Sequence, residues 1–484
     1  NDSLPGTDWG SALKSIATAV AKTDADEVFL SVGTHQVATN VVLNKAIAIK
    51  GILSAELGEV IVKGNSANVN YNRAFYLNHS GALIENIKID SSSVITPTAN
   101  QEAVGGGVLV KNGTIRNCWI NDCQSYKSGG GVYIETGTIE NSLITGNTCG
   151  FNNVGVSTNS GGGLFLLNNV SVINCRVLDN TSTGPGGGIS MNGNSTITDC
   201  AIENNTAANR GGGVVLGSGQ IINSSIANNS CGNDTETDGG GGVFSEIGGA
   251  ISKSRIVGNS AGKNAPGGGV CVKNNSAEFL LFDTLIASNT AVHGAGVMLW
   301  SPSLDSATIR NSLVAYNKAE KFLDSVWSVA GAVIGAAGGV SLYNAETGYV
   351  INCTIAKNIA DEVAGGVYTI NSGNLINTVI FANTASGASG EKNWANMGTF
   401  ASYNYCISAT TPPGNNSLGA DPLFVDANAG NFVLQSDSPA VNAGLNDDWM
   451  VGATDFNGQP RIRHTVVDMG CFETLFRGTV QRVW

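Results

Sequence analysis

Hydrophobic and polar positions alternate along much of the chain with a period of two. Val132-Tyr133-Ile134 and Val270-Cys271-Val272 are examples, and runs of glycine and asparagine separate such segments. A period of two is typical of β-strands with one buried face, whereas an amphipathic helix has a period near ~3.6 residues. The pattern therefore predicts many short strands joined by tight turns.

These strands belong to an internal repeat, whose unit reads roughly Ile-x-Asn-Cys/Ser-x-Ile-x-x-Asn-Thr-x-Ala, then a glycine run, then Val-x-Val. The shortest spacings between units are 24 or 25 residues. The first polar column contains Asn86, Asn117, Asn141, Asn174, Asp199, Asn223, Lys253, Asp283, Asn311, Asn352 and Asn377. The second column contains Cys123, Asn147, Asn180, Asn205, Asn229, Asn259, Asn289, Asn317, Asn358 and Asn383. The last glycines of the runs are Gly107, Gly131, Gly163, Gly188, Gly213, Gly242, Gly269, Gly296, Gly339 and Gly366.

Strands this short cannot bury their inward faces alone, so neighbouring units must stack and share one core. The sequence predicts an all-β fold, a single-stranded parallel β-helix, and the handedness of crossover connections makes it right-handed. Asparagine at a fixed turn can bond the next coil through its amide, and it also tolerates left-handed backbone. The glycine runs supply conformations closed to other residues or allow close approach.

The ends of the chain lack the repeat and predict two flanking parts. Residues 1–60 are expected to form an N-terminal cap, in which Trp9, Leu13, Ile16 and Val20 have helical spacing and Asp8 is a candidate N-cap. Residues 61–415 are expected to form the coils and residues 416–484 a C-terminal capping module. Caps cover the core and strand edges that terminal coils would otherwise expose.

The C-terminal part carries four motifs in order: Asp421-Pro422-Leu423-Phe424-Val425-Asp426, Ser438-Pro439-Ala440-Val441-Asn442-Ala443-Gly444, Asp455-Phe456-Asn457-Gly458-Gln459-Pro460-Arg461-Ile462 and Asp468-Met469-Gly470-Cys471-Phe472-Glu473. With the repeat, they make the chain resemble the secreted bacterial right-handed parallel β-helix proteins of the pectin-lyase-like fold. The motifs themselves resemble a choice-of-anchor module. The resemblance implies export and a bacterial cell-surface or secreted location, and it implies no single reaction.

Composition excludes several classes of protein. The net charge is −12, which disfavours nucleic acid and anionic membranes as partners, and no apolar stretch is long enough for a transmembrane segment. The 64 glycines and 10 prolines fit neither collagen nor a disordered chain. No signal peptide precedes the repeat, so the sequence is expected to start after processing or after truncation. A monomer is expected.

The 10 cysteines show no clear bridge pattern. Small buried filler explains them better than a disulfide framework does, although Cys175 and Cys200 occupy one column of consecutive coils and a bridge between them is an open alternative.

Long insertions emerge from one turn of the repeat, between the second asparagine column and the last glycine. The usual count there is 7 to 10 residues, but it is 16 from Asn147 to Gly163, 13 from Asn229 to Gly242 and 22 from Asn317 to Gly339. Either they build a binding surface or the turn is permissive. Asp234, Glu236 and Asp238 in the middle insertion form either a weak Ca²⁺ site or a solvated acidic loop, the second being favoured. No other cofactor is expected.

Catalytic signals are weak. Pectin-hydrolysing β-helices carry an Asn-Thr-Asp triplet, an Asp-Asp pair and a Gly-His-Gly. The first and third strings do not occur here, and the one Asp-Asp pair, Asp447-Asp448, lies in the C-terminal part outside the repeat. A β-elimination enzyme would need a base such as Arg or Lys and a charge stabiliser for the substrate carboxylate. The candidates are Arg210, Lys263 and His293, with Asp238 of the acidic cluster.

Large apolar residues recur at the outward position of the strand that follows the glycines. Seven of ten are large: Leu109, Tyr133, Phe165, Val215, Phe244, Met298 and Tyr368. The stripe is either covered internally or contacts sugars or protein, and Tyr133, Phe165 and Phe244, with Trp327 of the longest insertion, are the binding candidates.

Two functions follow as hypotheses. The first is an exported, cell-surface-associated, non-catalytic β-helix for recognition of a polysaccharide or a surface protein, an adhesin-like role. The alternative is a polysaccharide lyase or glycoside hydrolase with an active site in the central coils.

Overall fold

The structure is a computed structural model of the chain. It describes residues 6–22, 24–52, 58–64, 72–95, 102–150, 159–232, 239–273, 276–300, 307–322, 334–387 and 392–474. Contacts divide the chain into two compact units, the first comprising Asn1–Ala250 and Val257–Ala265 and the second Ile251–Ile256 and Pro266–Trp484. Strands β29 (Gly249–Ser252) and β30 (Arg255–Val257) contain residues of both.

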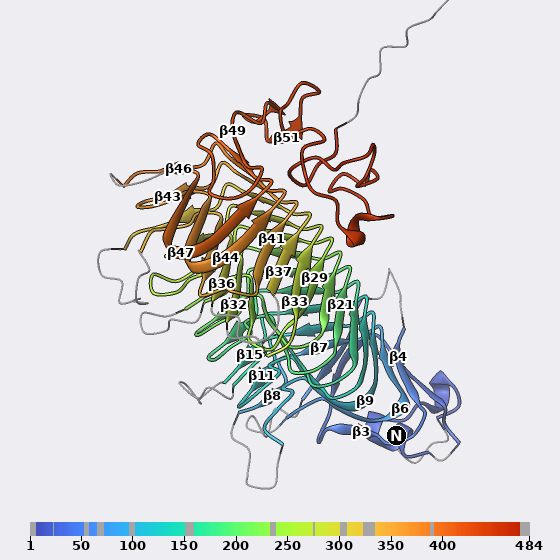
Figure 1. Ribbon diagram of the computed structural model, residues 1–484. Coiled ribbons are helices and arrows are strands. Elements are labelled where there is room, and N and C mark those ends of the chain that lie inside the picture. Colours follow the sequence, from blue (N-terminus) through green and yellow to red (C-terminus); the bar gives the residue numbers. More distant parts are fainter. Residues whose placement is uncertain are drawn as a thin grey trace, which may run out of the picture. The chain divides into compact units, whose positions relative to one another are not determined.

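In the first unit, each regular coil contributes strands to four parallel rows (Figure 1). Row one holds β3 (Val41–Leu43), β6 (Phe75–Glu85), β9 (Val108–Arg116), β12 (Val132–Ile134), β16 (Leu164–Leu166), β20 (Ile189–Met191), β24 (Val214–Leu216) and β28 (Val243–Ser245). Row two, into which β6 and β9 continue, holds β1 (Glu27–Leu30), β4 (Ala48–Gly51), β13 (Gly137–Glu140), β17 (Val170–Ile173), β21 (Thr196–Thr198) and β25 (Gln220–Ile222). Row three holds β2 (Gly33–Gln36), β5 (Val60–Lys63), β7 (Lys88–Asp90), β10 (Trp119–Asn121), β14 (Leu143–Thr145), β18 (Arg176–Leu178), β22 (Ala201–Glu203) and β26 (Ser225–Ala227). Row four holds β8 (Ser93–Val94), β11 (Gln124–Ser125), β15 (Thr148–Cys149), β19 (Thr181–Ser182), β23 (Thr206–Ala207), β27 (Ser230–Cys231) and β31 (Ser260–Ala261).

The second unit has the same four rows. Row one holds β32 (Val270–Lys273), β36 (Val297–Trp300), β40 (Val340–Tyr343), β44 (Val367–Ile376) and β47 (Trp394–Asn404), the last two of which continue into row two. Row two also holds β33 (Phe279–Phe282), β37 (Ala307–Arg310) and β41 (Gly348–Ile351). Row three holds β34 (Leu285–Ala287), β38 (Leu313–Ala315), β42 (Thr354–Ala356), β45 (Val379–Phe381), β48 (Ile407–Ser408) and β49 (Leu418–Gly419). Row four holds β35 (Thr290–Ala291), β39 (Lys318–Ala319), β43 (Ile359–Ala360) and β46 (Thr384–Ala385).

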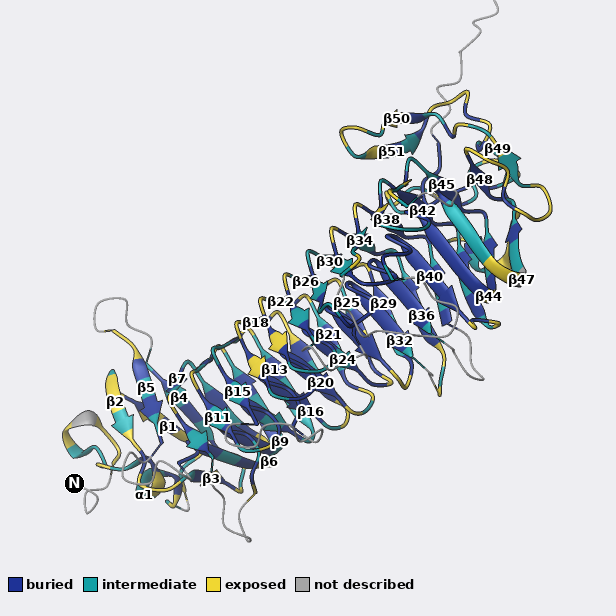
Figure 2. Cartoon of the chain, turned by 90° about the vertical axis from the view of Figure 1, so that its left-hand side faces the viewer, coloured by how far each residue is buried: buried dark blue, intermediate teal, exposed yellow. Residues whose placement is uncertain are grey.

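The fold is a right-handed parallel β-helix, as the repeat predicts. Within each unit, strands of one row pair in parallel and in register, for example Ile144 with Val177 and Val177 with Ile202. These three inward side chains are fully buried, and Figure 2 shows dark blue along the strands of each unit. Each coil therefore packs its apolar side chains against those of the coils on either side, and a single coil lacks these contacts.

The second asparagine column forms a buried ladder between rows three and four. The amide of Asn205 donates from Nδ2 to Oδ1 of Asn229 at 2.9 Å, and its own Oδ1 accepts from Nδ2 of Asn180 at 3.0 Å. The ladder continues from Asn147 to Asn259 in the first unit, and from Asn289 to Asn383 in the second. The predicted alignment along the stack is confirmed.

The first column has the other role that asparagine was expected to play. All its members have left-handed backbone, with φ of 51° at Asn117 and 48° at Asn223. Asparagine is among the few non-glycine residues that adopt this conformation readily. The first column thus combines left-handed backbone with amide bonds between coils, such as Asn174 to Asn141, whereas the second column is the buried ladder.

The glycine runs are required by close approach. A Cβ built on Gly213 would lie 2.8 Å from the carbonyl oxygen of Gly242 and 2.9 Å from Nδ2 of Asn229. The first glycine of the run, Gly211, has φ of 63°. The run therefore serves the turn and the asparagine ladder, which supports its interpretation as scaffold.

The N-terminal helix is shorter than its spacing predicts. Asp8 caps the 3₁₀ helix η1 (Trp9–Ser11), and Ala12 leaves helical geometry with ψ of 140°. A second N-cap, Ser15, then starts α1 (Ile16–Val20). Ile16 and Val20 are buried, and α1 packs on β1 and β3. Apolar spacing alone predicts one continuous helix. Asp8 and Ser15 each bond the backbone as an N-cap, so two short helices form instead.

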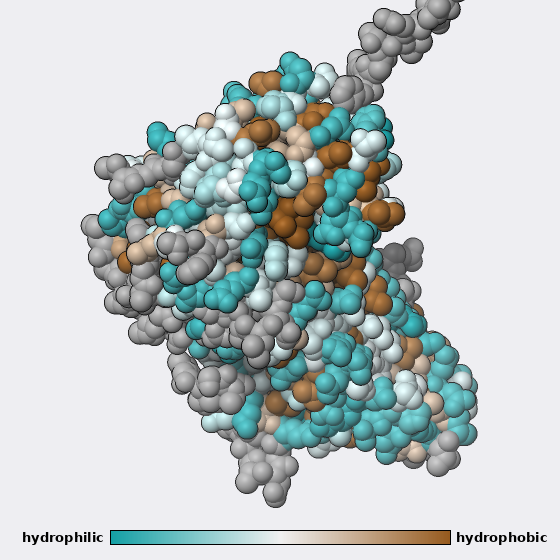
Figure 3. Space-filling model, viewed as in Figure 1, coloured by the Kyte–Doolittle hydropathy of each residue, from teal (hydrophilic) through white to brown (hydrophobic). Residues whose placement is uncertain are grey.

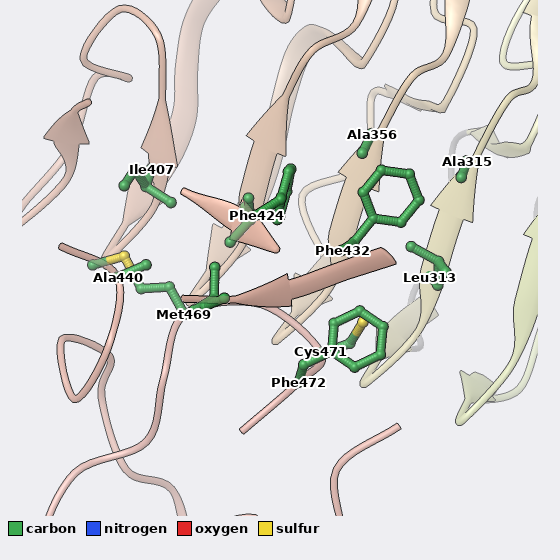
Figure 4. Close-up of a cluster of buried hydrophobic side chains, with 12 residues drawn as sticks. Leu313, Ala315, Ala356, Ile407, Phe424, Phe432, Ala440, Met469, Cys471 and Phe472 are labelled. Carbon is green, nitrogen blue, oxygen red and sulfur yellow. The ribbon is translucent and has the colours of Figure 1, made fainter. Parts of the chain in front are cut away.

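The C-terminal segment of the second unit, residues 421–474, includes β50 (Phe424–Asp426), β51 (Asn431–Leu434) and η2 (Asp448–Met450). Its apolar side chains cover the outer face of row three, where Phe424, Phe432, Met469, Cys471 and Phe472 cluster with residues of β38, β42, β45 and β48 (Figure 4). Asn377, a member of the first column, donates to the carbonyl of Leu445 at 2.8 Å and accepts from its N–H at 2.7 Å. The segment therefore covers a side of the coils through both apolar and polar contacts.

A charged cluster is buried inside this segment. Arg461 is 0 % exposed and donates to the carbonyls of Gly470 at 2.5 Å and Asp468 at 3.2 Å. Its guanidinium lies 3.5 Å from Glu473, and Asp455 and Asp468 are also buried. Burial, opposed by Arg461 and assisted by Asp468, raises the pKa of Glu473 to about 8. These four residues come from the third and fourth C-terminal motifs.

We expect the second unit to lose stability as the pH rises from about 4.5 to about 8. Glu473 ionises near 4.5 in an unfolded chain and near 8 in the folded one, so the folded state binds more protons across this window. Its stabilising contribution is complete below the lower pKa and lost as the pH passes the upper one. Urea unfolding at a series of pH values should show this slope, and Glu473→Gln, which keeps an oxygen for the N–H of Asp468, should flatten it. An unchanged slope in the variant would contradict the assignment.

All ten cysteines are buried and free. The backbone N–H of Cys175 points at Sγ of Cys200 at 3.4 Å, but no disulfide joins them. Burial raises the pKa of Cys118 to about 12, which suits an inert apolar filler.

Candidate functional site

The outward stripe of row one is a straight row in the structure. In the first unit, Leu109, Tyr133, Phe165, Ser190, Val215 and Phe244 are successive register partners. The rings of Tyr133 and Phe165 stack with centroids 4.9 Å apart and an angle of 5°. Phe165 is 7 % exposed and Phe244 is 0 % exposed, while Tyr133 is half-buried. Most of this row is therefore packed and not open.

Charged side chains lie near Tyr133, the half-buried residue of this row. Lys111 lies 2.6 Å from Glu135 and 3.1 Å from Glu102. Although burial opposes it, hydrogen bonding to these two carboxylates raises the pKa of Lys111 to about 12. Lys111 is thus a fixed cation held by its own neighbours.

Arg210 is also engaged within the first unit. Its guanidinium lies 4.7 Å from the ring centroid of Phe244 and 3.2 Å from Glu246. The backbone of Arg210 forms a parallel bridge with Gly239. These contacts hold Arg210 as a cover over Phe244.

His293 belongs to the second unit and is fully buried. Its Nε2 lies 2.7 Å from Oγ of Ser341, and its ring meets that of Tyr368 edge-on at 5.7 Å. A hydroxyl beside an imidazole is the pair used in nucleophilic catalysis. Because Ser341 is 0 % exposed as well, this pair is closed to a polymeric substrate in the structure.

The remaining predicted residues lie outside the described part of the chain. Asp234, Glu236 and Asp238 fall in 233–238 and Trp327 in 323–333. The insertions that contain them follow row-four strands β27 and β39 and precede row-one strands β28 and β40. Within the described residues, no group of three or more His, Cys, Asp or Glu side chains is arranged to hold a metal ion.

A groove on row three of the first unit is the most promising site. It encloses about 470 Å³ and is lined by Val60 of β5, by the outward side chains of β7, β10 and β14, and by the turns before these strands. Trp119, Leu143 and Ile52 supply apolar lining. Register places Trp119 between Lys88 and Leu143, one from each neighbouring coil. The groove therefore exists only because three coils are stacked.

Of the described residues in this lining, Lys88 and Glu59 have charged side chains. The ammonium of Lys88 lies 3.7 Å from the ring centroid of Trp119 and 3.9 Å from a carboxylate oxygen of Glu59. The indole Nε1 of Trp119 is enclosed and has no hydrogen-bond partner among the described residues. Packing and the cation therefore set the orientation of the ring, and the two charges cancel.

Three turn residues complete the lining, namely Asn86, Asn117 and Asn141 of the first column. Asn117 and Asn141 are exposed. Oδ1 of Asn141 accepts a hydrogen bond from Nδ2 of Asn174 in the next coil at 2.8 Å. Carboxamides offer both donors and acceptors, so this edge of the groove can bond hydroxyl groups.

Sequence reasoning missed this groove. Among the row-three strands described in the first unit, Trp119 is the only tryptophan, tyrosine or phenylalanine, and this was the available signal. A second hollow of about 900 Å³ lies around α1 and β1 and is lined by many charged residues, including Lys14, Asp26 and Glu27. The Trp119 groove differs in combining an aromatic ring with a row of amides.

No protein-family model and no curated protein matches the chain. Similar solved structures include pectate lyase Pel9A, at 13% identity and a TM-score of 0.32, covering 98% of this chain and 94% of that one. The periplasmic alginate epimerase AlgG matches at 11% identity and a TM-score of 0.33, over 79% of this chain and 86% of that one. PfbA, a surface adhesin of Streptococcus pneumoniae, matches at 13% identity and a TM-score of 0.36, over 85% and 90%. Similarities at this level do not say which activity, if any, the chain has.

Proposed function

We propose that the protein is an exported bacterial β-helix, associated with the cell surface, that recognises a carbohydrate without catalysing a reaction, in an adhesin-like role. The observation that carries this proposal is the groove of about 470 Å³ lined by Trp119 and the turn asparagines. Sugars present apolar C–H faces and hydroxyl groups together. An aromatic ring beside carboxamides matches both.

The state of the catalytic candidates supports binding over catalysis. Arg210 is held by Phe244 and Glu246, and His293 by Ser341 and Tyr368. Both residues thus have packing roles in their own units. Tyr133, which is half-buried, is a second carbohydrate contact that we propose on row one.

Attachment to the surface is part of the same proposal. Among the described residues, no helix is both long and apolar enough to cross a bilayer. We assign attachment to the C-terminal segment, because its motifs resemble a choice-of-anchor module. Exposed apolar residues of that segment include Val451, Val425 and Leu445. Figure 3 shows hydrophobic and hydrophilic side chains mixed on the face that it draws.

Trp119→Ala is expected to lower the affinity for a bound glycan by about tenfold or more, since the ring is the largest apolar surface in the groove. A glycan array followed by calorimetry with the best ligand measures this. Val215→Ala, on row one of the same unit, is the control and should bind as the parent does. Incubation with acidic and neutral polysaccharides tests the alternative: unsaturated or reducing ends would establish a lyase or hydrolase and overturn the non-catalytic proposal.

A further inference from the structure

The lining of the Trp119 groove repeats from coil to coil. Glu59 precedes β5, Asn86 precedes β7, Asn117 precedes β10 and Asn141 precedes β14, so the four turns belong to consecutive coils. Parallel strands lie ~4.8 Å apart, and the amides of the last three turns therefore recur at about that interval along the stack. One sugar ring of an extended linear glycan advances by a similar length.

The charge of the groove is balanced. Among the lining residues that the structure describes, Lys88 is the single cation, and it lies against Trp119 and 3.9 Å from Glu59. The chain as a whole carries a net charge of −12. A polyanion would meet one already engaged cation and a repulsive field, whereas a neutral chain of sugars meets neither cost.

The apolar and polar parts of the lining are also arranged for an extended ligand. Trp119 and Leu143 are register partners on adjacent row-three strands, so apolar surface continues along the stack. The asparagine turns run beside these strands, each two residues before the outward side chain. A linear glycan parallel to the stack would place its apolar C–H groups along the first line and its hydroxyls along the second.

Building on the proposed function, we infer that the groove binds a neutral linear glycan lying parallel to the coil stack, with one sugar residue per coil across four coils. The turn amides bond the hydroxyls, and Trp119 and Leu143 pack against the rings. The groove therefore selects glycans by their length as well as by their chemistry.

The test is a length series of neutral oligosaccharides, from disaccharide to hexasaccharide, of the cello, manno, xylo and laminari types, with oligogalacturonates as the acidic arm. Affinity for the neutral series should rise several-fold with each residue up to the tetrasaccharide and then level off, with little dependence on salt. The intact chain is used throughout.

Asn117→Gly provides a matched variant. Glycine adopts the φ of 51° at this turn without strain, so the change removes the amide and leaves the backbone as it is. We expect about a fivefold loss of affinity for the tetrasaccharide. Asn223→Gly, at the same turn of a coil outside the groove with φ of 48°, is the control and should show no loss.

The possible outcomes distinguish this inference from the proposed function on which it rests. Equal affinity for all lengths, or preference for the acidic arm, would overturn the neutral, one-residue-per-coil inference while recognition of carbohydrate stood. Binding that Trp119→Ala and Asn117→Gly leave unchanged would place the glycan elsewhere and overturn it as well. Failure of every glycan to bind would overturn both.

Discussion

Replacing Asn205 with alanine should lower the free energy of unfolding of the first unit by about 3–5 kcal/mol. The side chain is fully buried and donates from Nδ2 to the carbonyl of Val177 and to Oδ1 of Asn229, each at 2.9 Å. Its Oδ1 accepts from the backbone N and from Nδ2 of Asn180, both at 3.0 Å. Alanine removes all four bonds. The buried backbone N–H of Asn180 loses its acceptor, and Nδ2 of Asn180 and Oδ1 of Asn229 each lose one of their two partners, which costs more than the net gain that the bonds provide.

Urea unfolding and hydrogen exchange measure this effect, the second because it reports which coils open. Thr206→Ala is the matched control, since Thr206 is the next residue, is exposed, and should change stability by less than about 0.5 kcal/mol. Faster exchange should be concentrated in the coils of Asn180, Asn205 and Asn229. If Asn205→Ala behaves like the control, the ladder does not stabilise the stack.

Replacing Arg461 with methionine should destabilise the C-terminal segment of the second unit by about 3–5 kcal/mol. Arg461 is fully buried, and its removal takes the cation from beside the carboxyl group of Glu473, which lies 3.5 Å away. The carbonyls of Gly470 and Asp468 lose their donor at the same time. Methionine has a similar length, so the loss reflects charge and hydrogen bonding more than volume.

Limited proteolysis and hydrogen exchange over residues 421–474 would detect the loosened segment. Arg463→Met is the control, because Arg463 is in the same segment, is partly exposed, and contacts the side chain of Gln459 at 3.4 Å. We expect release of protection at row-three strands β42 and β45, which the segment covers. Protection equal to that of the control would show that Arg461 contributes little to docking.

Local, periodic features of the fold could be predicted from the sequence. The spacing of Asn180, Asn205 and Asn229 gave the alignment of the ladder, since every coil repeats the same constraint. Two-residue strands such as β19 (Thr181–Ser182) could not be predicted, because they are too short to show a period. The helix near Ile16 was overestimated because a polar N-cap, Ser15, outweighs apolar spacing.

The candidate site was beyond prediction for a different reason. Tyr133, Phe165 and Phe244 were correctly placed in one outward row, but their exposure depends on what lies above them, and no residue pattern encodes that cover. Arg210 and His293 were chosen for their chemistry, and the structure gives each its own packing partners. Trp119 was overlooked because it is a single aromatic residue at a position where the other coils have none, so it belongs to no repeating column.

The sequence by itself determined the stacked coils, the two roles of asparagine and the position of the glycine runs, because each rests on interactions that repeat at a fixed interval. The tertiary structure alone decided that Lys88, Trp119 and Leu143 meet in one groove and that residues 421–474 cover the side of row three. Those contacts join residues of different coils, or of a coil and a non-repeating segment. They depend on shape and charge complementarity between distant parts of the chain. A repeating sequence pattern carries no information about such complementarity.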